Sequence, residues 1–105
     1  MHVIQIEGGT GPAEALSLVE RLDPTPGPGE VLIRVRAAGV NRPDLLQRQG
    51  LYPPPPGAPD GLGLEVAGEV AAVGGGVARW TIGGRGCAPL GGGGYGSLAA
   101  GDARR

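Results

Sequence analysis

Short apolar runs separated by glycine and proline organise this chain of 105 residues. The runs cover residues 3–6, 16–22, 31–35 and 66–73. From residue 31 to 36, three β-branched residues alternate with Leu32 and two arginines, which is the two-residue period of a strand with one mostly polar face. The 23 glycines and 11 prolines fall mainly between the runs, as turn residues between strands do. The pattern predicts a mainly β fold, a partly closed antiparallel β-barrel.

One short helix is predicted after the third run, from about Pro43 to Gln49. Proline suits the first helical turn because its missing N–H is not needed there, and Asp44 is stabilised by the positive end of a helix. Gly50 is placed to end the helix in a left-handed conformation, and the four prolines that begin at residue 53 favour an extended segment. Asn41 would then lie at a strand-to-helix junction, where side chains commonly face a cleft.

Charge and cysteine content limit the classes of function. Nine basic and ten acidic residues give a net charge of -1, and no basic block suggests a nucleic-acid partner. The single cysteine, Cys87, excludes an internal disulfide and fits a reducing compartment; we interpret it as a small buried apolar residue. Because the sequence shows neither a signal peptide nor an apolar membrane span, we expect a cytoplasmic protein.

Two glycine-rich stretches are candidates for phosphate-binding loops. Residues 8–11 follow an apolar run, but Glu14 stands where the dinucleotide fingerprint needs glycine or alanine, and its carboxylate would repel a pyrophosphate. We therefore predict a hairpin turn there. Residues 91–94 precede no helical pattern and are interpreted as a flexible turn. On this basis no dinucleotide is expected to bind to this chain alone.

Residues 39–74, GVNRPDLLQRQGLYPPPPGAPDGLGLEVAGEVAAVG, carry the most specific pattern. They resemble the quinone oxidoreductase and zeta-crystallin branch of the medium-chain dehydrogenase/reductase superfamily. Zinc-dependent relatives have a cysteine at the position of Asn41 and a histidine-glutamate pair at the positions of Leu64 and Glu65. A catalytic zinc needs about three protein ligands, and only one remains here, so we expect no metal site.

The resemblance also implies roles for individual residues. Asn41 and Tyr52 resemble cleft groups that face the nicotinamide and the substrate, with Asn41 also contacting the cofactor. Asp44 and Arg48 resemble residues that fix the helix and loop presenting them. Helix capping is a compatible role for Asn41 and Asp44, and packing on the proline run is an alternative for Tyr52. Glu65 is expected either to bond to neighbouring backbone or to form part of the active-site wall.

The end of the chain departs from the family. Residues 83–86 replace the usual turn and strand start with glycines, which weakens a strand, and the likeness is judged to end at Tyr95. We therefore expect a GroES-like domain at residues 1–95, the incomplete first domain of a two-domain reductase, and a divergent, disordered tail at residues 96–105. A truncated or frame-shifted reading and a deliberately cut domain both fit this pattern. Missing segments would expose strand edges and favour a homo-oligomer.

Two classes of function remain open. In the first, the chain supplies one wall of the cleft of an NADPH-dependent reductase that moves hydride to a quinone or an α,β-unsaturated carbonyl. Such a chain would be inactive alone, because it has no dinucleotide fingerprint. In the second, it is a non-catalytic GroES-like module for folding or assembly. The family resemblance favours the first.

Overall fold

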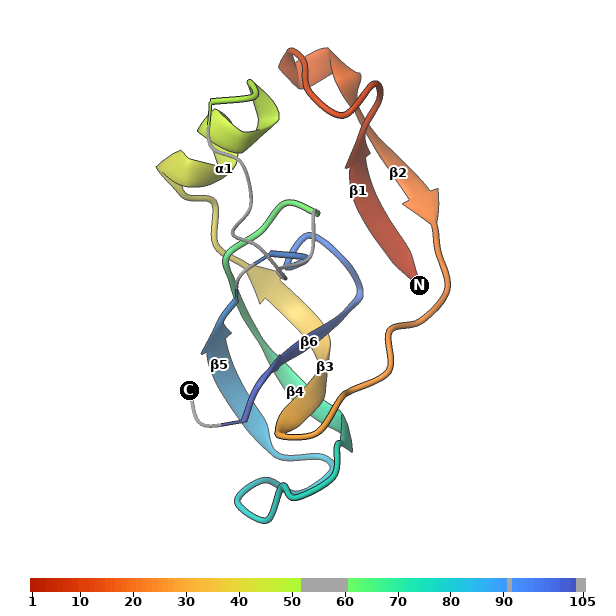
Figure 1. Ribbon diagram of the computed structural model, residues 1–105, viewed down its shortest axis with the longest axis vertical. Coiled ribbons are helices and arrows are strands. Elements are labelled where there is room, and N and C mark those ends of the chain that lie inside the picture. Colours follow the sequence, from red (N-terminus) through yellow and green to blue (C-terminus); the bar gives the residue numbers. More distant parts are fainter. Residues whose placement is uncertain (52–60, 91, 104–105) are drawn as a thin grey trace.

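The computed structural model describes residues 1–51, 61–90 and 92–103. The strands in these ranges are β1 (His2–Ile6), β2 (Leu16–Glu20), β3 (Glu30–Ala38), β4 (Glu65–Val73), β5 (Arg85–Pro89) and β6 (Leu98–Asp102). One α-helix, α1 (Arg42–Arg48), and one 3-10 helix, η1 (Ala13–Ala15), complete the described elements. Figure 1 shows α1 and the turn between β1 and β2 at one end of the molecule, with the connection from β4 to β5 at the other.

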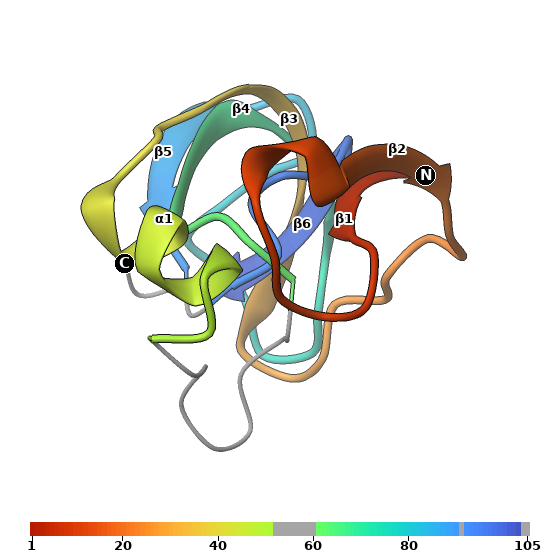
Figure 2. The same cartoon turned by 90° about the horizontal axis from the view of Figure 1, so that it is seen from above.

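The strands form two antiparallel sheets. The larger has the order β5-β4-β3-β6, and the smaller pairs β1 with β2. Figure 2 shows the larger sheet curling around its own interior, so that its edge strands β5 and β6 approach each other. Within the described residues, backbone hydrogen bonds do not close this sheet into a barrel. The predicted class is confirmed: the fold is mainly β, antiparallel and only partly closed.

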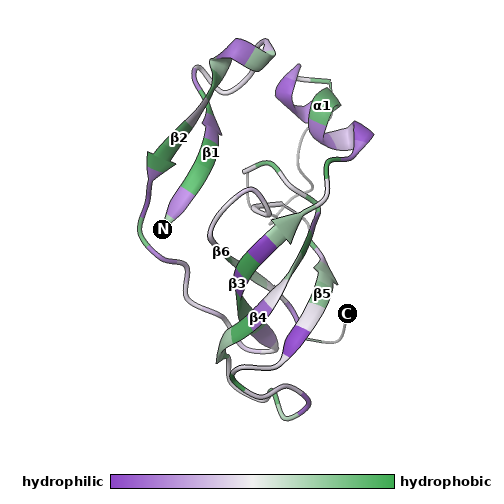
Figure 3. Ribbon diagram, turned by 180° about the vertical axis from the view of Figure 1, so that it is seen from behind, coloured by the Kyte–Doolittle hydropathy of each residue, from purple (hydrophilic) through white to green (hydrophobic). Residues whose placement is uncertain are grey.

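The core lies inside the curled sheet. Its buried residues are Val31, Ile33, Val66, Val70, Ala88 and Ala103. Val31 and Ile33 expose only 4% and 5% of their surface, which confirms the inward face of the predicted alternating strand. Leu32 is also buried, so the outward face is less polar than expected. Figure 3 shows the resulting alternation of polar and apolar residues along β3 and β4.

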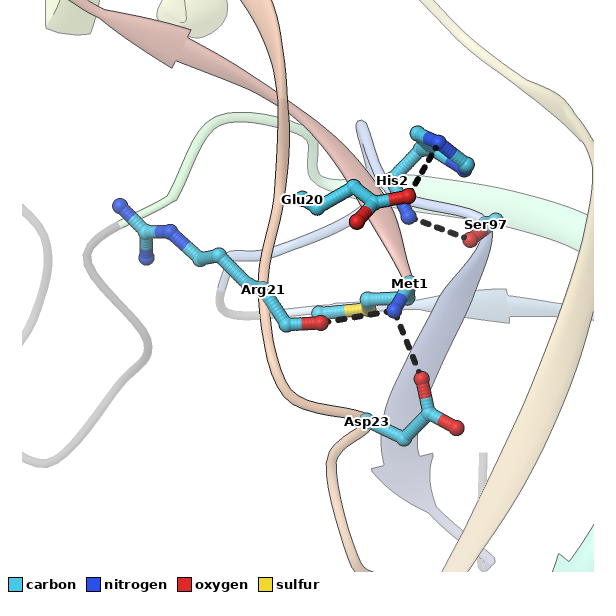
Figure 4. Close-up of polar contacts among 6 residues, drawn as sticks. All are labelled: Met1, His2, Glu20, Arg21, Asp23 and Ser97. Carbon is cyan, nitrogen blue, oxygen red and sulfur yellow. Dashed lines mark hydrogen bonds and ion pairs between the residues drawn. The ribbon is translucent and has the colours of Figure 1, made fainter.

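The β1–β2 hairpin is attached to the larger sheet through the segment before β6. Ile4 donates its backbone N–H to the carbonyl oxygen of Tyr95 at 2.8 Å, and Val3 forms an isolated bridge with Gly96. Figure 4 shows the His2 backbone N–H donating to Ser97 Oγ at 3.0 Å. Since β1 and β2 run antiparallel through a turn that includes residues 8–11, the prediction of a hairpin is confirmed.

The last part of the chain differs from the expected disordered tail. Residues 98–102 form β6, which pairs with β3 from Leu98 opposite Arg34 to Asp102 opposite Glu30. The physical reason is that β3 has an open edge whose backbone groups need partners, and the small Ala99, 4% exposed, fits against it. The expectation of disorder is therefore wrong for residues 98–102.

Strand β5 forms although glycines precede it, because its backbone pairs with β4 from Glu65 opposite Pro89 to Glu69 opposite Arg85. Its glycine at position 86 lies against Trp80, whose ring would be 3.0 Å from an added Cβ. Cys87 is exposed on this strand, so its interpretation as a buried residue is wrong.

Candidate functional site

The strand-to-helix junction predicted at Asn41 is present. Asn41 is the N-cap of α1 with extended backbone angles, φ −122° and ψ 159°, and the helix begins at Arg42, one residue before the predicted start. Asp44 N–H donates to the Asn41 carbonyl at 3.0 Å, and Asn41 N–H donates to Asp44 Oδ2 at 2.9 Å. Gly50 has φ +85°, which confirms its predicted left-handed conformation after the helix. The junction is thus fixed by its own capping residues.

Asp44 lies at the centre of the site and is only 2% exposed. Its Oδ2 atom also accepts a hydrogen bond from the Tyr95 hydroxyl at 2.8 Å. The other carboxylate oxygen, Oδ1, is buried and has no hydrogen-bond partner among the described residues. Burial, and then the hydrogen bond to Asp44, raise the pKa of Tyr95 well above its ordinary value. Tyr95 therefore remains a protonated donor throughout the physiological pH range.

Glu65, the first residue of β4, contacts Asn41 from the other side. The Asn41 Nδ2 atom donates to Glu65 Oε1 at 3.1 Å. Gly39 makes this arrangement possible, because a Cβ at that position would overlap the Glu65 carboxylate. Since a carboxylate only accepts hydrogen bonds, this contact sets the amide nitrogen of Asn41 toward Glu65. Within the described residues, Glu65 Oε1 thus accepts from the Asn41 side chain and not from neighbouring backbone.

Arg48 fixes the opposite end of α1. Its Nη1 atom donates to the Gly11 carbonyl at 2.9 Å, and Gly11 N–H donates back to the Arg48 carbonyl at 2.7 Å. These bonds tie the helix to the turn between β1 and β2. Tyr52, the second predicted cleft residue, lies outside the described residues. The structure therefore brings Asn41, Asp44 and Glu65 together at one end of α1 and places Arg48 at the other.

The donor set at this junction does not resemble a zinc site. Asn41 presents its amide N–H to Glu65, and the half-buried Leu64 offers no side-chain ligand. In the described ranges, no group of three or more histidine, cysteine, aspartate or glutamate residues is arranged to hold a metal ion. What the junction offers is an oriented carboxamide beside a carboxylate, which can position a polar ligand by hydrogen bonding.

Tyr95 was missed as a site residue. From the sequence, Tyr95 is assigned no role other than as the residue at which the family resemblance is expected to end. It lies 51 residues from Asp44, so no local spacing predicts their contact. The only signal in the sequence is a single tyrosine that follows a run of glycines.

Comparison with known proteins identifies the family. The alcohol dehydrogenase GroES-like domain matches residues 27–102, and the chain belongs to this family. The likeness therefore continues past Tyr95, where we expected it to end. The quinone oxidoreductase of Pseudomonas aeruginosa is 49% identical over 82 residues, which are 78% of this chain and 25% of that protein. The rat synaptic vesicle membrane protein VAT-1 homolog is 47% identical over 79 residues, 73% of this chain and 20% of that protein.

Solved structures agree with this assignment. The Escherichia coli quinone oxidoreductase complexed with NADPH matches 98% of this chain with 36% identity and a TM-score of 0.83, over 31% of its own chain. A human VAT-1 homolog-like protein matches 97% of this chain with 33% identity and a TM-score of 0.86, over 33% of its own chain. The predicted resemblance to quinone oxidoreductases is confirmed.

The chain spans about a quarter of the length of the quinone oxidoreductases that it matches. Among the described residues, no helix is both long enough and apolar enough to cross a membrane.

Proposed function

We propose that this chain is the substrate-side domain of an NADPH-dependent quinone oxidoreductase, which transfers hydride from the nicotinamide to a quinone or an α,β-unsaturated carbonyl. The observation that supports this function most directly is that hydrogen bonds fix both the backbone and the side chain of Asn41. Its backbone is bonded to Asp44 and its side chain to Glu65, in a domain shared with an Escherichia coli quinone oxidoreductase crystallised with NADPH. The site is proposed to be zinc-free.

The role proposed for these residues is orientation. NADPH supplies the hydride when it is bound, and transfer depends mainly on holding donor and acceptor in the correct geometry. Asn41 and Tyr52 are proposed to contact the nicotinamide and the acceptor. Asp44 and Arg48 hold the two ends of α1 and keep Asn41 in place. The proposal assigns no general acid or base to this chain.

The phosphates of NADPH are proposed to bind outside this chain. A phosphate-binding loop needs backbone N–H groups at the start of a helix that follows a strand. Residues 8–11 instead belong to the connection of an antiparallel hairpin. We therefore expect the purified chain to show no turnover and no saturable NADPH binding at micromolar concentrations.

A chimera tests the proposal. The aligned first segment of the Pseudomonas aeruginosa quinone oxidoreductase is replaced by the present chain, and NADPH oxidation is followed with a quinone acceptor. We expect quinone-dependent turnover in the chimera. The Asn41→Ala chimera should lose at least about tenfold in kcat/KM, because misplacing a reactant slows hydride transfer. The Glu20→Ala chimera, altered at an exposed residue far from α1, serves as the matched control. A folded but inactive chimera would favour the non-catalytic assembly module instead.

A further inference from the structure

Tyr95 joins three separate parts of the chain. Its backbone N–H donates to the Leu62 carbonyl at 3.0 Å, and its carbonyl accepts the N–H of Ile4 at 2.8 Å. Its hydroxyl donates to Asp44 Oδ2 at 2.8 Å. The backbone of Tyr95 is thus held by β1 and by the segment before β4, while its side chain reaches the first turn of α1.

The backbone position of Tyr95 is further restricted by Gly63. This glycine has φ +105°, and a Cβ there would lie 2.5 Å from the Tyr95 nitrogen and 2.7 Å from the Gly94 Cα. Gly94 in turn donates its N–H to the Gly63 carbonyl at 3.0 Å. The two segments therefore approach each other more closely than side chains would allow. As a result, the backbone from which the Tyr95 side chain extends is fixed by a framework of β1 and residues 61–64, outside α1.

The same carboxylate oxygen connects this framework to the candidate site. Asp44 Oδ2 accepts both the Tyr95 hydroxyl and the Asn41 N–H, whereas Oδ1 has no partner among the described residues. Hydrogen bonds on one oxygen thus anchor the buried carboxylate. We infer that Tyr95 is a positioning residue of the candidate site: through Asp44, it fixes the N-cap of α1 and therefore the place from which Asn41 is presented. The contribution of this placement to hydride transfer rests on the proposed function. The hydrogen-bonded link from Tyr95 through Asp44 to Asn41 does not depend on that function.

Amide exchange and NMR on the whole chain test this inference without a cofactor. Tyr95→Phe removes the hydroxyl and keeps the ring. Its control is Trp80→Phe, which removes another aromatic donor, bonded at 3.0 Å to the Ala103 carbonyl, away from α1. We expect Tyr95→Phe to speed exchange of the Asn41 backbone amide by about 10- to 100-fold, the factor that corresponds to the loss of one hydrogen bond to a charged group. It should also shift the Asn41 side-chain amide signals while amides of β3 and β4 stay protected.

Two results would overturn the inference. One is unchanged Asn41 signals in folded Tyr95→Phe protein; the other is an equal change in the Trp80→Phe control. If Tyr95→Phe does not fold, the original chain decides the question. We expect its Tyr95 hydroxyl proton to exchange slowly enough to be observed and to show a nuclear Overhauser effect to the Asn41 amide proton. Absence of that signal would contradict the inference. An inactive chimera, in contrast, would contradict the proposed function and leave this structural link standing.

Discussion

Asp44→Asn should destabilise the domain more than any change of a single exposed carboxylate. The substitution keeps the size of the side chain but removes its charge, and two donors bond to the affected group. Hydrogen bonds to charged groups contribute about 1.5–3 kcal/mol, compared with about 0.5–1.5 kcal/mol for neutral pairs, so each bond weakens by about 1 kcal/mol. Loss of the negative charge in the first helical turn removes a further 0.3–1 kcal/mol, approximately.

Two further effects act in opposite directions. The new amide group places a donor where the present Oδ1 has no partner, at a cost of about 1–3 kcal/mol. Burial of a charge is no longer needed, which offsets part of this loss. We expect the free energy of unfolding to fall by at least about 2 kcal/mol, a large fraction of the roughly 5–15 kcal/mol typical of a domain.

Urea unfolding followed by circular dichroism measures this change, with Glu14→Gln as the control because Glu14 is exposed in η1. A fall of less than about 0.5 kcal/mol, the range of ordinary surface substitutions, would refute the reasoning. So would an equal fall in the Glu14→Gln control, because that variant leaves the capping bonds intact.

Three other predictions concern the site and the larger sheet. Gly39→Ala should displace the flexible Glu65 carboxylate and shift the Asn41 side-chain NMR signals. The free energy of unfolding should change by less than about 1 kcal/mol. Unchanged signals would count against the contact between Asn41 and Glu65. The hydrogen bond from Arg36 lowers the pKa of Glu69. The pair should therefore stabilise the fold at pH values above the ordinary glutamate pKa, and this stabilisation should disappear as the pH falls through the lowered pKa. Glu69→Gln should therefore flatten the acid side of a thermal-unfolding profile against pH, and an identical profile would exclude the effect. Purified protein should contain no stoichiometric zinc by inductively coupled plasma mass spectrometry, and one zinc per chain would contradict the proposed zinc-free site.

Local rules were sufficient to predict the elements whose residues determine their own conformation. The alternation at residues 31–35 predicts β3, because its β-branched residues face the core. Pro43, Asp44 and Gly50 predict the short helix, because each fits one position at a helix start or end. Asn41 could be placed at the junction for the same reason.

Tertiary pairing determines the rest. Strands β5 and β6 contain glycine and alanine, which have weak strand preference, and they form because β4 and β3 offer open edges. The bonds from Tyr95 to Asp44 and from Asn41 to Glu65 join residues that are 51 and 24 positions apart. No spacing rule predicts such contacts, because they depend on how the sheets and α1 come together.

A crystal structure of the chimera with NADPH bound would test the central claim most directly. We predict that the Asn41 side chain lies within about 4 Å of the nicotinamide ring or its ribose, the range of direct contact. We also predict that Asp44 and Glu65 keep the hydrogen bonds to Asn41 described above. A nicotinamide bound with Asn41 turned away from it, toward solvent, would contradict the claim that this junction forms the wall of a hydride-transfer cleft.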